Sequence, residues 1–598
     1  MRKVRIMNTE CRTTKPWHRH PADNVPGSSA GSRCHTQPRG HGRPARHLQS
    51  PQVLRLCSLF LFCLTPLALA DVTLNPLFSD HMVLQRDRAV PVWGNASPGE
   101  KVSVDFAGQT VQATADDKGN WKAELPPLTA SAESRPLTAK GANTVTVNDV
   151  VVGDVWLASG QSNMDSPMSS GSAAAGLPEA NDPLLRFFTV TKSVAAEPQT
   201  DVKGQWLTTT PDNAKNFSAI AYFFAREIRK SQNIPVGVIR SSWGGTPIRT
   251  WMSLVSIEKA PPLAKALAEW ESARAKHLAT KDQPQVMEDY YRDMKDWETN
   301  VEPAFKAAKK AHPAAVAAAK AAGQPAPPSP QPERPEPEMP NPIAMPSASK
   351  RPSVPTITYN AMIAPLAPFA LKGVLWYQGE ADVSRHADYR ELFPRLIEGW
   401  RGDFRQPELP FLFVQLPPNG TDPTPVATQG LAFMRDAQAS ALNLPAAGMA
   451  VTIDIGDPAD VHPDNKVHTG GRLALVARNK VYGENVVASG PVYQSHEIKD
   501  GAVRIKFDHT GGGLVTGVAP WRAKNAAPVP TDRLVGFFLA GADRKWVEAD
   551  ARIDGDTVIV SSASVPAPVA VAYGWNASPT VNLYNKEGLP AAPFKIGE

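Results

Sequence analysis

The chain has 598 residues, of which 42% are hydrophobic and 20% charged, enough for two to four domains with substantial cores. Its formal net charge is +5, with 63 basic and 58 acidic residues. From Asp71 onward there are 52 basic and 56 acidic residues, so the excess of positive charge lies in the first 70 residues. That balance gives no indication of a nucleic-acid partner or of an anionic membrane surface. All four cysteines precede Asp71, which excludes disulfides, zinc–thiolate sites and cysteine nucleophiles from the rest of the chain.

Residues 53–70 (VLRLCSLFLFCLTPLALA) have an arginine, a short apolar core and an Ala-x-Ala end, which are typical of a secretory signal peptide. The apolar core is too short to span a membrane comfortably, and no later run of 18 apolar residues follows. We therefore predict a leader and signal peptide over 1–70, cleavage after Ala70, and an exported protein, periplasmic or extracellular, without a membrane anchor. Residues 1–50 are polar and lack periodicity, as expected of a disordered leader or of a misplaced start codon.

The two ends of the exported chain have the pattern of β-strands. Apolar and polar residues alternate in 102–106 and again in 503–507, and Asp554-Gly555 is typical of a hairpin turn. We predict an N-terminal β domain over 71–150 and a C-terminal β domain over 481–598, both sandwich-like.

Between them, residues 151–480 alternate short apolar strands with helical stretches, which predicts an α/β domain with a parallel sheet covered on both faces. The expected strands after the first one cover 235–242, 371–377, 410–416 and 447–453, and the expected helices include 219–228 and 471–478. In such folds ligands bind at the carboxyl ends of the strands, where this chain places its polar clusters.

An insertion over 261–355 interrupts this domain. Residues 261–322 are rich in Ala, Lys and Glu and are expected to be helical, whereas the proline-rich stretch 323–355 is expected to be extended or irregular. A surface hairpin followed by a linker is favoured over a lid that closes on a substrate.

Ser162 follows the apolar run of Asp154–Met164 (DVWLASGQSNM), where a strand ends and a helix could begin. At such a place the hydroxyl can act as a nucleophile, and the free backbone N–H can help to bind an oxyanion. The alternative is that Ser162 only caps the helix, with Asp165 completing a capping box.

A serine nucleophile needs a base, and His462 is the candidate. It follows the last predicted strand, whereas the histidines His386 and His468 have no such acidic surroundings. Asp460 lies two residues before His462, so in an extended loop both side chains project to the same side; Asp457 competes for the role of the acid. Two alternatives are a metal loop built from Asp454, Asp457, Asp460 and His462, and a simple helix N-cap.

Oxyanion donors are expected from Gly244 and Gly245, because a glycine backbone can approach a ligand closely, and from the amide of Gln378. The arrangement differs from the α/β-hydrolase elbow Gly-x-Ser-x-Gly, since Met164 stands where that motif needs its second glycine.

Four blocks in this order resemble the motif blocks of sialate O-acetylesterases, which belong to the SGNH hydrolase superfamily of carbohydrate esterases. They are Gly153–Met164, Ser242–Pro247, Trp376–Ala381 and Val461–Lys466, within a resemblance that runs from about Leu74 to Phe594 and includes 359–362 and 582–588. It implies an SGNH-type hydrolase domain within the α/β class, flanked by the two β regions.

The resemblance also implies site roles: Ser162 matches the nucleophile, His462 the base, and Gly244 and Gly245 the oxyanion position. In the superfamily the third block supplies an Asn after a Gly; here Gln378 is the expected substitute, and Asn360 and Glu380 are expected to line the oxyanion and substrate pocket.

The acid of the superfamily usually stands three residues before the histidine, where this chain has Ala459. Asp460, Asp457 and a Ser–His pair without an acid therefore all stay open.

The resemblance implies an esterase that releases acetate from O-acetylated sugars through an acyl-serine intermediate, without a cofactor or metal. The implied substrates are 9-O-acetylated sialic acids, with acetylated xylan or another plant glycan as the alternative. A non-catalytic glycan-binding protein and a metal-dependent hydrolase are the rival functions. The expected partner is the O-acetylated carbohydrate itself, not a nucleic acid.

Overall fold

The computed structural model describes residues 71–258, 264–347, 350–421, 424–519 and 529–597. The predicted leader and signal peptide, with its cleavage site, lie outside the described residues. The described residues from Asp71 onward belong to one compact unit. Among the described residues, no helix is both long and apolar enough to span a membrane.

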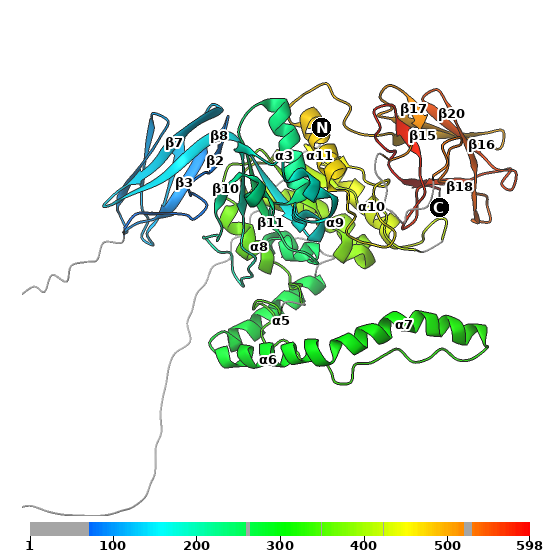
Figure 1. Ribbon diagram of the computed structural model, residues 1–598, viewed down its shortest axis with the longest axis horizontal. Helices are drawn as coiled ribbons and strands as arrows, with labels where there is room; N and C mark the ends of the chain where they lie inside the picture. Colours follow the sequence, from blue (N-terminus) through cyan, green and yellow to red (C-terminus); the bar gives the residue numbers. More distant parts are fainter. Residues whose placement is uncertain (1–70, 259–263, 348–349, 422–423, 520–528, 598) are drawn as a thin grey trace, which may run out of the picture. The chain divides into compact units, whose positions relative to one another are not determined.

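A mostly parallel sheet forms the centre of this unit (Figure 1), with the strand order β10-β9-β11-β8-β12-β13-β14. Neighbouring strands run parallel from β9 to β14, and β10 pairs antiparallel at one edge. The strands are β8 (Thr144–Gly160), β9 (Asp182–Thr189), β10 (Trp206–Thr209), β11 (Val236–Ser242), β12 (Gly373–Tyr377), β13 (Phe411–Val414) and β14 (Ala447–Ala450). The predicted parallel sheet is thus confirmed, with β9 and β10 as strands that the sequence pattern does not predict.

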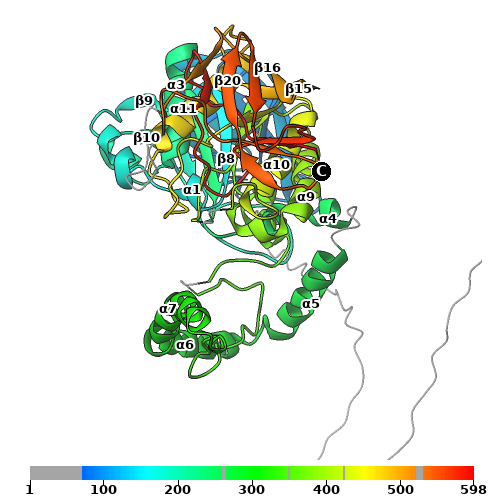
Figure 2. The ribbon, with the colours of Figure 1, turned by 90° about the vertical axis from the view of Figure 1, so that its right-hand side faces the viewer.

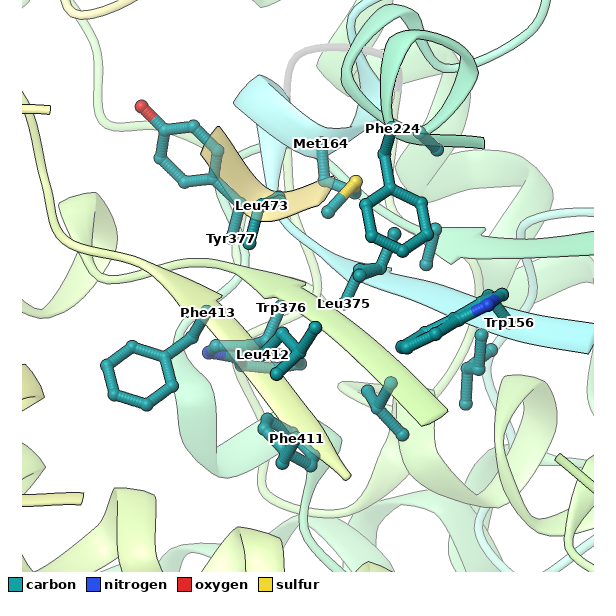
Figure 3. Packing of buried hydrophobic residues seen from close by; sticks show 14 of the residues in the cluster. Trp156, Met164, Phe224, Leu375, Trp376, Tyr377, Phe411, Leu412, Phe413 and Leu473 are labelled. Carbon is teal, nitrogen blue, oxygen red and sulfur yellow. The ribbon is translucent and has the colours of Figure 1, made fainter. Parts of the chain in front are cut away.

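Helices cover both faces of this sheet because its strands are apolar on both sides. On one face Trp156 of β8 lies edge-on to Phe224 of α3, with ring centroids 4.9 Å apart (Figure 3). On the other face Trp376 of β12 contacts Trp400 of α9 at a centroid distance of 5.7 Å. The helices are α1 (Ser162–Asp165), α2 (Pro211–Ala214), α3 (Ala219–Gln232), α8 (Ile357–Met362), α9 (His386–Asp403), α10 (Leu431–Ala439) and α11 (Lys466–Lys480).

Strand β8 joins the N-terminal β region to the central sheet. Its 17 residues run from Thr144 to Gly160, so the expected boundary between residues 150 and 151 lies inside one continuous strand. The first half pairs antiparallel with β7, and the second half pairs parallel with β11 and β12. The other N-terminal strands are β1 (Thr73–Leu74), β2 (Val83–Gln85), β3 (Val90–Asn95), β4 (Lys101–Phe106), β5 (Gln109–Thr114), β6 (Asn120–Leu125) and β7 (Ser131–Lys140).

The C-terminal region contains antiparallel sheets, as the alternating pattern predicts. Two sheets have four strands each, in the orders β15-β16-β21-β20 and β19-β18-β22-β24, and β17 pairs with β23. The strands are β15 (Val492–Lys499), β16 (Ala502–Asp508), β17 (Leu514–Thr516), β18 (Phe537–Ala540), β19 (Trp546–Glu548), β20 (Asp550–Asp554), β21 (Thr557–Ser561), β22 (Ala570–Tyr573), β23 (Leu583–Asn585) and β24 (Phe594–Ile596). The predicted α/β class, with β regions flanking a parallel sheet, is confirmed.

The insertion contains helices α5 (Ala264–Thr280), α6 (Pro284–Asn300) and α7 (Glu302–Ala321), after the short α4 (Leu254–Glu258). In both Figure 1 and Figure 2 these helices lie outside the layers that cover the central sheet. Trp297 and Met294 of α6 are buried in a small cluster of their own, whereas α7, described over its full length, has no buried residue. The described residues between α7 and α8 contain no helix or strand, as the proline content predicts.

Candidate active site

Ser162 is the first residue of α1, directly after the carboxyl end of β8. Gly160 makes this connection possible: its φ is +131°, and a Cβ at this position would lie 2.1 Å from the carbonyl oxygen of Tyr377. The N-cap residue of α1 is Gln161, and its side chain makes no capping hydrogen bond. The capping alternative for Ser162 is therefore wrong, and Asp165 instead accepts a hydrogen bond from Ser242 Oγ at 3.1 Å.

His462 lies against Ser162 although 300 positions separate them in the sequence. The distance between His462 Nε2 and Ser162 Oγ is 2.8 Å, and the imidazole is half-exposed. His462 belongs to the loop that follows β14, so both residues meet at the carboxyl end of the parallel sheet. This is the hydrogen-bond geometry of a serine nucleophile and its general base.

Asp460, not Asp457, faces the imidazole. Its Oδ1 lies 3.6 Å from His462 Nδ1 and accepts a hydrogen bond from the backbone N–H of His462 at 2.8 Å. The 3.6 Å separation exceeds a hydrogen bond, and 59% of the Asp460 side chain is exposed. Asp457 Oδ1 accepts from the backbone N–H of Ala459 instead.

A metal loop would need Asp454 to converge with these acids. Instead the Asp454 carboxylate binds both terminal nitrogens of Arg472, at 2.6 and 2.7 Å, and accepts from the Tyr584 hydroxyl at 3.1 Å. Within the described ranges, no group of three or more His, Cys, Asp or Glu side chains is arranged to hold a metal ion. The other two candidate histidines lie elsewhere: His468 Nδ1 pairs with Asn465 in α11, and His386 packs on Phe433.

Gly244 lies directly beside the nucleophile. A Cβ at this position would be 3.2 Å from Cβ of Ser162, so glycine keeps the two backbones this close. The N–H of Ser162, at the first turn of a helix, has no partner within that helix. The backbones of Ser162 and Gly244 therefore lie side by side where β8 ends. At Gly245 an added Cβ would lie 2.9 Å from Cγ of Arg351.

Gln378 is not placed as the expected oxyanion donor. It is fully buried, and its amide nitrogen donates to the carbonyl of Thr246 at 3.1 Å and to Asp382 Oδ2 at 2.7 Å. Because an amide group has two N–H bonds, both are already used.

The amide nitrogen of Asn360 is also already engaged. Its amide nitrogen donates to the carbonyls of Ala195 and Ala196, at 3.2 and 2.9 Å, so Asn360 fixes a neighbouring loop.

Asn163 connects the two sides of the site, a role that the sequence analysis misses. Its amide nitrogen donates to Glu380 Oε1 at 2.6 Å and to the carbonyl of Val461, the residue before His462, at 3.0 Å. Its Oδ1 accepts from Nζ of Lys466. Glu380 is therefore connected through Asn163 to the loop that carries His462, and burial raises the pKa of its carboxyl.

Lys466 is buried at the start of α11, and burial lowers its pKa to about 8. In the sequence, Asn163, Glu380 and Lys466 share one feature: each lies in a motif block that resembles sialate O-acetylesterases.

Two further contacts hold the histidine loop from outside. Asp464 Oδ1 accepts from the backbone N–H of Ser172 at 2.7 Å. Before His462 in the chain, the carbonyl of Asp457 accepts from the amide nitrogen of Asn419 at 3.3 Å. A half-exposed histidine is thus held by fixed neighbours on both sides.

Comparison with known proteins adds independent findings. Residues 351–478 match the family model of the carbohydrate esterase, sialic acid-specific acetylesterase. The chain is 29% identical to rat sialate O-acetylesterase, over 70% of this chain and 75% of that protein. It is 27% identical to the mouse sialate O-acetylesterase, over 86% of this chain and 92% of that protein. The crystal structure of XAC1771, a carbohydrate acetylesterase from Xanthomonas citri, is 35% identical, with a TM-score of 0.68, over 88% of this chain and 99% of that chain.

The fold, the site and these matches define a carbohydrate acetylesterase. The chain belongs to the sialate O-acetylesterase family, as its motif blocks predict.

Proposed function

We propose that this esterase removes acetyl groups from sugar hydroxyls through an acyl-serine intermediate. The observation that supports it is the 2.8 Å distance between His462 Nε2 and Ser162 Oγ. His462 takes the hydroxyl proton while Ser162 Oγ bonds to the acetyl carbonyl carbon. The N–H groups of Ser162 and Gly244 then stabilise the negative charge on the carbonyl oxygen.

The tetrahedral intermediate collapses when the bond to the sugar oxygen breaks, and the proton held by His462 passes to that oxygen. Water then gives a proton to His462 while its oxygen attacks the carbonyl carbon of the acetyl-serine. When the bond to Ser162 Oγ breaks, His462 returns the proton to Oγ, which releases acetate and restores the serine hydroxyl. Asp460 lies on the Nδ1 side of the imidazole, where its negative charge stabilises the imidazolium formed in both steps.

The proposed substrates are 9-O-acetylated sialic acids, because the rodent relatives are named sialate O-acetylesterases. The relative with a solved structure is described only as a carbohydrate acetylesterase, so acetylated xylan is the comparison substrate. We propose that the protein works after export, in the periplasm or outside the cell, since residues 53–70 have the features of a signal peptide.

The test uses the chain from Asp71 onward and measures acetate release from 9-O-acetylated N-acetylneuraminic acid, acetylated xylan and an aryl acetate, 4-nitrophenyl acetate. We expect Ser162→Ala to abolish release from every substrate, while Ser169→Ala, an exposed serine of the following loop, stays at the wild-type rate. A wild type and a Ser162→Ala variant that are equally inert but bind glycans would contradict the esterase mechanism. Loss of activity in chelator, with Ser162→Ala still active, would indicate a metal-dependent hydrolase.

A further inference from the structure

A cavity of about 290 Å³ borders the histidine loop at Val461, the residue before His462. Its lining includes Glu380 and Val461, and the amide of Asn163, the residue after Ser162, donates to both. The remaining wall residues include Leu416, Asn419, Leu431 and Ala577. The cavity therefore lies on the histidine side of the nucleophile.

We propose that this cavity is the subsite for the sugar ring that carries the acetyl ester. The inference rests on the proposed function, and it adds where the leaving group binds. In acyl transfer the base returns its proton to the leaving oxygen. The sugar must therefore extend from Ser162 toward His462, and Val461, which borders the cavity, directly precedes His462 in the chain.

The chemistry of the lining fits a polyhydroxylated ring. Most of the wall is apolar and suits the C–H faces of a sugar, and one carboxyl group lies among these side chains. Glu380 Oε1 is bound by Asn163, whereas Oε2 is buried and has no hydrogen-bond partner among the described residues.

An unpaired buried acceptor destabilises the folded protein, because it has lost its hydrogen bonds to water. A hydroxyl ligand removes that cost in either protonation state of the carboxyl, because a hydroxyl group both donates and accepts.

The wall is built into the fold. Arg435 is fully buried and donates to the carbonyls of Asn576 and Ala577, at 2.7 and 2.9 Å, and to the carbonyl of Leu416 at 2.7 Å. One guanidinium thus fixes a loop of the C-terminal β region against the strand end of the esterase domain. The volume is close to the lower end of the roughly 300–1,000 Å³ of small-ligand pockets, so it suits one ring and exceeds the needs of an acetyl methyl group.

The test fills the cavity without touching the catalytic pair. Ala577→Leu adds bulk to the wall, and Ala551→Leu, at a half-buried alanine of β20, is the matched control. For Ala577→Leu we expect KM for 9-O-acetylated N-acetylneuraminic acid or acetylated xylose to rise. The rise should be about tenfold or more larger than any change in KM for 4-nitrophenyl acetate, which has no sugar. The control is expected to keep both at wild-type values, with thermal unfolding showing that both variants are folded.

A second variant tests the carboxyl. Glu380→Gln keeps an acceptor for Asn163 but replaces Oε2 with an N–H donor, and KM is expected to rise selectively for the acetylated sugar. An equal rise in KM for the acetylated sugar and for the aryl ester would overturn the assignment of the cavity as a sugar subsite. A changed preference between 4-nitrophenyl acetate and 4-nitrophenyl butyrate in Ala577→Leu would also overturn it, because the cavity would then bind the acyl group. If the wild type releases no acetate at all, the proposed function fails. The cavity is then tested by calorimetry with free N-acetylneuraminic acid and xylose, where equal binding by wild type and Ala577→Leu overturns it.

Discussion

The two members of the catalytic pair are positioned in different ways. Ser162 follows β8, a strand paired on both sides by β11 and β12, and its position follows from the sheet and from the turn at Gly160. His462 lies in a loop, is half-exposed, and is held by side chains that reach it from other segments. The nucleophile is therefore fixed by backbone hydrogen bonds, and the base by a few side-chain contacts. Substitutions of those contacts should separate catalysis from folding.

The largest effect is expected for His462→Ala. We expect kcat for 4-nitrophenyl acetate to fall about 10⁴-fold or more, because the base acts in both chemical steps. The free energy of unfolding should change by less than about 1 kcal/mol, since the side chain is half-exposed. Steady-state kinetics and urea unfolding measure both quantities, with the exposed His496→Ala as the control. Retention of more than a tenth of the activity would rule out His462 as the base.

A smaller loss is expected for Asp460→Asn, which tests the weakest contact of the base. The loss of a triad aspartate costs about 10⁴-fold in kcat when that residue is buried and hydrogen-bonded. Here the carboxylate is 59% exposed and 3.6 Å from Nδ1, so we expect a loss on the order of 10²-fold. Asp457→Asn should stay near the wild-type rate. If Asp460→Asn has wild-type kinetics, Asp460 has no role in catalysis and the enzyme works with a Ser–His pair alone.

Asn163→Ala tests the contact that joins the two sides. We expect kcat to fall about tenfold, because the loop before His462 loses the hydrogen bond to the Val461 carbonyl. Stability should fall by about 1–3 kcal/mol, since Glu380 and Lys466 lose a buried partner. The matched control is Asn582→Ala, a buried asparagine of the C-terminal region whose amide also donates to two backbone carbonyls. It should lose stability without a comparable loss in kcat; equal kinetic losses in both would contradict a specific role for Asn163.

These differences also explain which features the sequence could predict. The apolar strands of the central sheet and the alternating strands of both β regions follow from local patterns that the structure keeps. Ser162 and His462 could be paired because each stands in a polar segment at a strand end. Strand β10 could not be predicted, since its residues Trp-Leu-Thr-Thr form neither an apolar run nor an alternating pattern.

The side-chain contacts were beyond sequence reasoning because their partners are distant. The amide of Gln378 is engaged by Thr246, 132 positions away, and Asn163 reaches Glu380 across 217 positions. No spacing rule gives such pairs, so the sequence places Gln378 at the oxyanion and overlooks Asn163.

Lys466 gives a stability effect that depends on pH. Its pKa is about 8 in the folded protein against 10.5 for the ordinary side chain, because burial disfavours the charged form. Between these values the unfolded chain binds more protons than the folded one. The free energy of unfolding should therefore rise with pH over this range, by at most about 1.4 kcal/mol per pH unit. Urea unfolding at about pH 7.5, 9 and 10 should show this rise in wild type relative to Lys466→Met. A pH-independent difference between the two proteins would contradict a buried, titrating lysine.

The smallest effect on catalysis is expected for a substitution in helix α6 of the insertion, whose buried residues form a cluster of their own. Trp297 of α6 is 3% exposed, and its indole N–H donates to the carbonyl of Arg334 in the proline-rich segment. Trp297→Ala should open this local cluster, seen as faster hydrogen exchange over 284–347, while kcat/KM stays within about twofold. Trp400→Ala, in α9 against the central sheet, removes a similar volume from the main core and should lower global stability by about 3–5 kcal/mol. A large rise in KM for acetylated sugars in Trp297→Ala alone would show that the insertion acts as a lid over the substrate and is more than a surface hairpin.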